Sequence, residues 1–250
     1  HHPDPTVKEN LIDLIKLMKT GNYDVGIAFD GDADRVGVVD ETGEVIWADQ
    51  LMALFLPELV NPGDEILYDV KCSKALEEEI IKYQGKPVMW KTGHSLVKQK
   101  MFELNCKFGG EMSGHIFFAD DYFGYDDAIY VAARLLQTLS RSKKTLSELR
   151  SELPKYFSTP EIRLEANSDE EKFMISKKAV DYFTANFDCS TVDGVRINFE
   201  DGWGLVRASN TQPVIVCRFE ATSEERMQQI KKLITDKLNE MGELKFDVGH

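Results

Sequence analysis

Cysteine is scarce in this sequence, and its spacing argues against the usual cysteine-based sites. The chain of 250 residues contains four cysteines, with no Cys-x-x-Cys pair and no accompanying pair of histidines. They are Cys72, Cys106, Cys189 and Cys217. This pattern does not indicate zinc ligands and is typical of reduced thiols in a cytosolic protein. We therefore expect a cytoplasmic location.

Long apolar runs and an excess of positive charge are also missing. No run of 18 apolar residues and no signal-peptide pattern occurs, so we expect no membrane contact. Lys and Arg number 30 against 43 Asp and Glu, which gives a net charge of −13. This balance argues against a nucleic-acid partner. The length is sufficient for a sizeable core and indicates two or more domains.

Three aspartates alternate between two short apolar segments near the start of the chain. Asp30, Asp32 and Asp34 lie between the segments 25–29 and 36–39, which resemble buried strands. Alternate positions can direct three carboxylates towards one point, where they repel one another unless a cation joins them. Oxygen ligands without nearby His or Cys favour Mg²⁺ or Ca²⁺.

An EF-hand is the first alternative for this acidic loop. Its sixth position would be Arg35, where the EF-hand requires glycine, and its flanks are strand-like rather than helical. A solvated acidic turn is the second alternative, but the strict alternation inside apolar flanks disfavours it. We therefore expect a strand-flanked Mg²⁺ loop, in which Arg35 could contact a bound phosphate.

The middle of the chain alternates strand and helix patterns. Strands are expected at 66–70 and 88–90 and favour an α/β domain with a largely parallel sheet. Ligand groups in such sheets collect just after the strand ends, where Lys71, Lys91 and His94 lie. From the residues alone, a solvated lysine and a structural histidine remain equally acceptable interpretations.

A glycine-rich stretch at 109–115 comes next and leads into an apolar strand. Glu111 accepts hydrogen bonds, and Ser113 and His115 can donate or accept them. A few fixed polar groups of this kind are suited to a neutral polyol. A glycine-rich hairpin with incidental polar residues is the alternative.

The last part of the chain indicates a different class of fold. Strand patterns alternate with two long helical patterns, which predicts an α+β domain with an antiparallel sheet and helices on one face. Its loop 207–213 offers an arginine fork, hydroxyls and an amide to a phosphate, although an ordinary hairpin turn also fits. The candidate phosphate ligands are Arg207, Ser209, Asn210 and Thr211.

These motifs together resemble the α-D-phosphohexomutase superfamily. The stretch 29–35 is similar to its metal loop, 110–115 to its sugar-binding loop and 207–213 to its phosphate-binding loop, in the family's order. The Glu-Met-Ser-Gly-His version resembles the phosphomannomutase/phosphoglucomutase branch, since glucosamine-specific relatives tend to carry another residue at Met112. The resemblance implies conversion of hexose 1-phosphate to hexose 6-phosphate through a bisphosphate, with mannose or glucose as the sugar.

The resemblance also implies a role for each candidate residue. Asp30, Asp32 and Asp34 would hold Mg²⁺ beside a phosphoserine. Arg35 and Lys71 would assist phosphoryl transfer, and Lys91 or His94 would act as general acid or base. The sugar-binding residues would be Glu111, Ser113 and His115. Arg207, Ser209, Asn210 and Thr211 would hold the phosphate that does not react.

One family motif, the active-site serine within a Ser-His-Asn-Pro type loop, is not found. We therefore expect a C-terminal portion of a mutase that is inactive alone and has a missing N-terminal domain as its partner. The expected divisions are 1–44, the tail of an α/β domain with the metal loop, 45–155, a mixed α/β sugar-binding domain, and 156–250, an α+β phosphate-binding domain. A non-catalytic phosphosugar-binding module and a phosphoglucosamine mutase remain alternatives.

Overall fold

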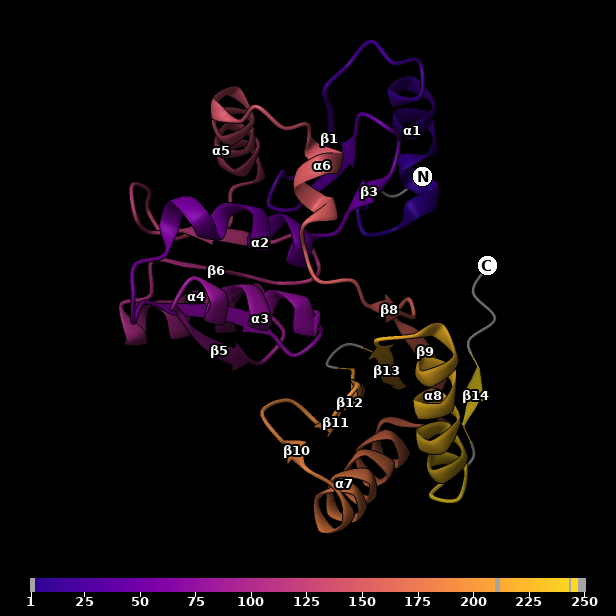
Figure 1. Cartoon of the computed structure of the whole chain (residues 1–250). Coiled ribbons are helices and arrows are strands. Elements are labelled where there is room, and N and C mark those ends of the chain that lie inside the picture. Colours follow the sequence, from indigo (N-terminus) through magenta and orange to yellow (C-terminus); the bar gives the residue numbers. More distant parts are fainter. Residues whose placement is uncertain (1–2, 210–211, 243, 247–250) are drawn as a thin grey trace. The chain divides into compact units, whose positions relative to one another are not determined.

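A computed structural model of the chain describes residues 3–209, 212–242 and 244–246. The chain divides into two compact units, residues 1–154 and 155–250, which are described separately. Figure 1 shows their helices and strands, coloured along the sequence. The further division expected at residue 44 stays a prediction.

The first unit begins with a small antiparallel sheet that carries the aspartate loop. A short 3₁₀ helix, Lys8–Leu11, and helix α1, Ile12–Met18, precede it. Its strands are β1, Val25–Phe29, β2, Val36–Asp40, and β3, Val45–Ile46, in that spatial order. The pairing of Phe29 with Val36 places residues 30–35 at the tip of a hairpin. The prediction that strands rather than helices flank this loop is confirmed.

A mixed four-stranded sheet forms the rest of the first unit, with strand order β5-β4-β6-β7. Its strands are β4, Glu65–Asp69, β5, Lys86–Trp90, β6, Phe108–Gly110, and β7, Ile116–Phe118. Strand β4 pairs in parallel with both β5 and β6, whereas β7 returns antiparallel to β6. The parallel ends of β4, β5 and β6 therefore meet at one edge, as the alternating sequence pattern predicted.

Helices cover both faces of this sheet. They are α2, Ala48–Leu59, α3, Lys74–Lys82, α4, His94–Leu104, α5, Ala128–Arg141, and α6, Leu146–Ser151. Ile66 and Tyr68 of β4 pack in one core cluster with α2, α3 and α5. Leu67, between them, packs with α4 in another. Since alternate side chains of a strand point to opposite faces, an apolar run such as β4 requires cover on both sides.

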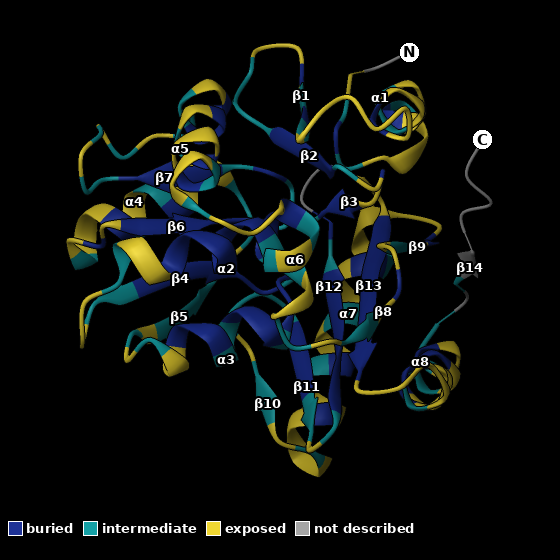
Figure 2. Cartoon of the chain, turned by 45° about the horizontal axis from the view of Figure 1, so that its top comes forward, coloured by how far each residue is buried: buried dark blue, intermediate teal, exposed yellow. Residues whose placement is uncertain are grey.

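The second unit contains one antiparallel sheet and two long helices. Its strands are β8, Phe157–Ser158, β9, Ile162–Glu165, β10, Cys189–Ser190, β11, Val195–Phe199, β12, Gly202–Ala208, β13, Val214–Ala221, and β14, Lys245–Phe246. The helices are α7, Asp169–Asn186, and α8, Glu224–Asn239. Figure 2 shows β11, β12 and β13 as buried and much of α8 as exposed.

Both long helices lie on the same face of this sheet. Phe183 of α7 and Ile230 of α8 belong to one core cluster together with Ile197, Val206 and Ile215 of the strands. Burying a side chain of this size contributes about 1.5–3 kcal/mol. The predicted fold class, an α/β domain followed by an antiparallel α+β domain with helices on one face, is confirmed. Within the described residues, every helix is too short or too polar to cross a lipid bilayer.

Candidate functional site

The loop between β1 and β2 gathers three carboxylates. One oxygen from each of Asp30, Asp32 and Asp34 lies within 4.8 Å of the others. Oδ1 of Asp30 accepts the backbone N–H groups of Asp34 and Arg35, each at 3.1 Å, so the loop folds back on its first aspartate. Ala33 adopts a left-handed conformation, with φ of 60°, which completes the bend.

Arg35 pairs with acids inside this region. Its Nε donates to Oδ2 of Asp30 at 2.7 Å, and its Nη1 donates to Oδ2 of Asp4 at 3.0 Å. Burial would raise the pKa of Asp30, but these hydrogen bonds outweigh it and the pKa is lowered. Arg35 therefore neutralises part of the charge that the loop concentrates.

Negative charge nevertheless remains in excess at Asp34. Its pKa is raised by burial and by the neighbouring carboxylates of Asp30 and Asp32, with His115 opposing the shift. A cation would relieve this repulsion, and three carboxylates form the hard oxygen set that Mg²⁺ and Ca²⁺ prefer. The residues present thus fit a divalent metal of this class.

Three of the sequence-predicted residues lie at the common edge of the parallel strands. Lys71 follows β4, Lys91 follows β5 and Glu111 follows β6. Glu111 is buried, Lys71 is half-buried and Lys91 is exposed. The sheet therefore brings residues that are 40 positions apart in sequence to neighbouring strand ends.

The glycine-rich loop after β6 is held by its own polar side chains. Oε1 of Glu111 accepts the N–H of Gly93 at 2.6 Å, and its Oε2 lies 3.3 Å from Nδ1 of His115. The hydroxyl of Ser113 lies 2.8 Å from the same nitrogen. Burial would lower the pKa of His115, but Glu111, with smaller help from Asp34, raises it.

This loop lies directly against the aspartate loop. The carbonyl of Gly114 accepts the N–H of Val36 at 3.1 Å, and Nε2 of His115 lies 3.4 Å from Oδ2 of Asp34. Gly114 has φ of 100°, and a Cβ there would lie 2.9 Å from the carbonyl oxygen of Val36. Glycine is therefore required both for the conformation and for the close approach.

His94 joins the same cluster from the start of α4. Its Nδ1 lies 2.9 Å from Oδ2 of Asp126, and its ring stacks on His115 with centroids 5.3 Å apart. Possible ligand atoms of Asp34, His94, His115 and Asp126 all lie within 4.8 Å of one another. The sequence interpretation had not placed Asp126 in the site.

Asp69 is a second residue that the sequence interpretation missed. It is fully buried at the end of β4 and accepts hydrogen bonds from three loops. The donors are the N–H of Met112 at 3.1 Å, the hydroxyl of Thr92 at 3.0 Å and the thiol of Cys72 at 3.1 Å. A charged residue that ends a strongly apolar strand at a ligand-binding edge was the available signal.

The candidate phosphate loop of the second unit joins β12 to β13. Arg207 is 6% exposed, and its Nε donates to Oδ2 of Asp193 at 3.0 Å. The N–H of Ser209 donates to the carbonyl of Val214 at 2.9 Å, which continues the strand pairing into the loop. Asn210 and Thr211 lie outside the described residues.

Three domain models of one family match this chain in order. The domain II model of phosphoglucomutase/phosphomannomutase matches residues 1–43, the domain III model 47–157 and the C-terminal domain model 161–237. The chain belongs to the phosphoglucomutase/phosphomannomutase family. The family resemblance inferred from the three loops is thereby confirmed.

Individual members of the phosphoglucomutase/phosphomannomutase family agree with this assignment. The chain is 49% identical over 95% of its length to phosphomannomutase/phosphoglucomutase of Pseudomonas aeruginosa, of which it covers 52%. It is 43% identical over 92% of its length to phosphoglucomutase of Neisseria gonorrhoeae, of which it covers 51%. The chain thus spans about half the length of these curated relatives.

A solved structure shows the same fold. A phosphoglucomutase/phosphomannomutase family protein of Burkholderia thailandensis superposes with a TM-score of 0.88 at 41% identity. The match covers 98% of this chain and 53% of the other. The fold described above is therefore that of the corresponding half of a family member.

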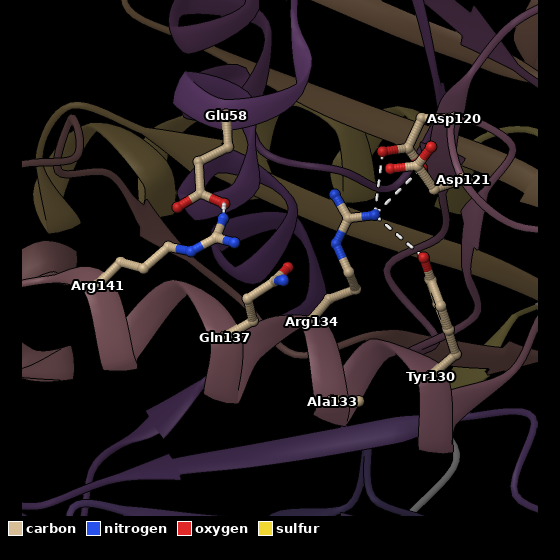
Figure 3. A pocket seen from close by; sticks show the side chains of 8 residues that line it. All are labelled: Glu58, Asp120, Asp121, Tyr130, Ala133, Arg134, Gln137 and Arg141. Carbon is tan, nitrogen blue, oxygen red and sulfur yellow. Dashed lines mark hydrogen bonds and ion pairs between the residues drawn. The ribbon is translucent and has the colours of Figure 1, made fainter.

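The first unit of the present chain also has a polar pocket beside α5, shown in Figure 3. It measures about 660 Å³ and is lined by residues of α2, α5 and the turn after β7. Arg134 donates to Asp120 at 3.0 Å and to the hydroxyl of Tyr130 at 3.1 Å, and Arg141 lies 3.9 Å from Glu58. Both arginines of this pocket are thus engaged by groups of the pocket itself.

Proposed function

We propose that this chain forms the metal-, sugar- and phosphate-binding portion of a phosphomannomutase/phosphoglucomutase. The whole enzyme would interconvert hexose 1-phosphate and hexose 6-phosphate, with mannose or glucose as the sugar, through a bisphosphate intermediate. One observation carries the proposal: the aspartate loop, the glycine-rich loop and His94 meet around Asp34 in a chain 49% identical to such an enzyme.

Asp30, Asp32 and Asp34 are the proposed Mg²⁺ ligands. Their oxygens lie close enough to share one ion, and the raised pKa of Asp34 reflects the charge that the ion would balance. Bound Mg²⁺ would stabilise the charge that develops on a transferring phosphoryl group. Arg35 and Lys71 would assist there, because Arg35 already lies in the loop and Lys71 follows the neighbouring strand end.

His94 is the better supported candidate for general acid or base. Its Nδ1 is oriented by Asp126 at 2.9 Å, and it stacks on His115 beside the aspartate loop. An oriented imidazole with one nitrogen engaged by a carboxylate can exchange a proton with a sugar hydroxyl through the other. Lys91 is exposed at the end of β5 and remains the alternative.

The remaining predicted residues are proposed to hold the substrate. Glu111, Ser113 and His115 form one hydrogen-bonded group next to the metal loop and would contact sugar hydroxyls. Arg207 and Ser209, with Asn210 and Thr211, would bind the phosphate that does not react, as the matching loop motif suggests. The bisphosphate must turn around between half-reactions, so this loop should accept either end of the sugar.

The catalytic serine is proposed to lie in the half of the relatives that this chain does not cover. Loss of a nucleophile can reduce turnover by about a millionfold. We therefore expect the 250-residue chain to be inactive when mannose 1-phosphate is supplied with Mg²⁺ and a hexose bisphosphate primer. Addition of the missing N-terminal region should restore turnover. Activity of the chain alone would contradict the assignment, and failure of both would favour a phosphosugar-binding module.

Substrate binding can be tested without turnover. Arg207→Ala should weaken binding of both mannose 1-phosphate and mannose 6-phosphate by about tenfold or more, since it removes a charge-assisted contact. Arg226→Ala is the matched control, because Arg226 lies on α8 and pairs with Asp201, and both residues are outside the candidate loop. Weakening of only one substrate would contradict a loop shared by both ends. Competition with glucosamine 1-phosphate would identify the rival specificity.

A further inference from the structure

Lys172 occupies an unfavourable position for a lysine. It lies near the start of α7 and its side chain is 2% exposed. An ammonium group loses much of its hydration on burial, and the N-terminal end of a helix repels cations. Its retention there requires strong compensating contacts.

Three oxygen atoms provide this compensation. Nζ of Lys172 lies 2.7 Å from Oδ1 of Asp169, 2.9 Å from the carbonyl of Ser209 and 3.0 Å from the carbonyl of Gln212. An ammonium group has three N–H donors, so the contacts match its full donor capacity. Asp169 itself is 69% exposed, and exposed ion pairs contribute little. The two backbone carbonyls, together with the Phe173 ring whose centroid lies 4.5 Å from Nζ, therefore provide most of the compensation.

The two carbonyls belong to opposite sides of the candidate phosphate loop. Ser209 follows β12, and Gln212 stands two residues before β13. The N–H of Gln212 also donates to Oγ of Ser209 at 3.3 Å, and its carbonyl accepts the N–H of Val214 at 2.8 Å. The buried ammonium group of Lys172 thus contacts both sides of the loop, through the carbonyls of Ser209 and Gln212.

We propose that Lys172 is a positioning residue for phosphate binding, which fixes the backbone of Ser209 and Gln212 on the two sides of the candidate phosphate loop and places a positive charge next to them. The inference rests on the proposed function of this loop. It adds to the binding machinery a residue of α7 that lies outside the family's loop motif. Because the ammonium group donates to the carbonyls of Ser209 and Gln212, it positions these two residues without itself being a phosphate ligand.

The test uses the 250-residue chain and titration with glucose 1-phosphate and with mannose 1-phosphate, followed by ³¹P NMR. Lys172→Met keeps the length of the side chain but removes its charge and donors, and should weaken binding by about tenfold. Lys172→Gln keeps an amide donor and should give an intermediate affinity. Lys178→Met is the matched control, because Lys178 on the same helix is exposed and donates to the carbonyl of Met241 at 3.1 Å. Mg²⁺ affinity should be unchanged in all variants.

The possible outcomes separate the inference from the proposed function. If the wild-type chain binds neither glucose 1-phosphate nor mannose 1-phosphate, the proposed function and the inference that rests on it both fail. If the wild-type chain binds either ligand and folded Lys172→Met binds that ligand equally well, only the inference is overturned. Should Lys172→Met lose the unfolding transition reported by Trp203, Lys172→Gln carries the test. Wild-type affinity in folded Lys172→Gln would then overturn the inference.

Discussion

The first unit assembles its candidate site from distant segments, whereas the second unit places its candidate phosphate ligands at the end of one strand and in the loop that follows it. Around Asp34 meet the loop after β1, His94 after β5 and His115 after β6. Arg207 and Ser209, in contrast, are close neighbours in sequence, the first near the end of β12 and the second directly after it. A defect in one segment of the first site should therefore affect the others, while a defect in the second should stay local.

The two sites also differ in their balance of charge. The first crowds carboxylates, and their repulsion raises the pKa of Asp34. The second contains buried cationic side chains that pair with acids and carbonyls. Arg207 donates to Asp193, and Lys172 donates to the carbonyl of Ser209. The first site is thus suited to binding a cation, and the second to binding an anion beside its positively charged side chains.

The largest expected effect is the loss of a carboxylate from the first site. Asp32→Asn should lower Mg²⁺ affinity by about 100-fold, since even removing a residue that orients a ligand costs about 10–100-fold. Asp32 is exposed, so the substitution should leave folding intact. Isothermal titration with Mg²⁺ measures the effect. Asp24→Asn, at an exposed position just before β1, is the control. Equal affinities would show that the acidic loop is not the metal site.

Asp69→Asn tests whether the first site depends on one buried residue. An amide cannot accept all three hydrogen bonds that the carboxylate accepts, so we expect the first unit to lose about 1–3 kcal/mol of unfolding free energy. Urea unfolding measures the loss. Asp64→Asn is the control, because Asp64 precedes the same strand at its opposite end. An equal loss of unfolding free energy in both variants would contradict the inference that Asp69 stabilises the three loops that donate hydrogen bonds to it.

Glycine substitutions test whether a defect in one loop affects the other segments of a site or stays within that loop. Gly114→Ala should move Val36 and thereby weaken Mg²⁺ binding several-fold, beyond the roughly 1 kcal/mol cost of a left-handed alanine. Gly63→Ala is the matched control, since its φ is 88° and nothing lies within 4 Å of a Cβ there. Gly194→Ala, whose Cβ would lie 2.3 Å from the carbonyl of Val206, should weaken only phosphate binding. Reduced Mg²⁺ affinity in Gly194→Ala would contradict the expectation that a defect in the second site stays local.

The smallest effect concerns acid stability. Hydrogen bonds outweigh burial and lower the pKa of Asp4 and Glu41, from ordinary values of 3.8 and 4.5. Such groups stabilise the fold above those values, and this contribution is lost as the pH falls through the lowered pKa. Asp34 acts in the opposite sense, because its protonation relieves repulsion. The net loss for the first unit should be below about 1 kcal/mol.

Urea unfolding at neutral and at acid pH, followed by tryptophan fluorescence, measures this loss. The chain has three tryptophans, and a variant with Trp47→Phe and Trp90→Phe retains only Trp203 of the second unit. The parent chain should unfold at a slightly lower urea concentration in acid, and this variant should show no such shift. The same shift in both would show that acid sensitivity is not confined to the first unit.

Local sequence patterns predicted much of the fold and located the three loops. Alternating aspartates between apolar segments predicted a strand-flanked loop with carboxylates close together, and the structure confirms both features. The apolar run 66–70 predicted a buried strand and placed Lys71 at its end. Asp126 and Asp69 were missed, because their partners His94, Thr92 and Met112 are 23 to 43 residues away in sequence.

The sequence by itself determined which residue types stand together along the chain: three carboxylates in one loop, polar groups between glycines, and an arginine with hydroxyls between two strands. Only the tertiary structure decided which of these groups meet. Strand order brings His94 and His115 to Asp34, and the packing of α7 places Lys172 in contact with Ser209, directly after β12. The physical reason is that periodicity and turn chemistry act over a few residues, whereas a site depends on sheet pairing and packing between distant segments.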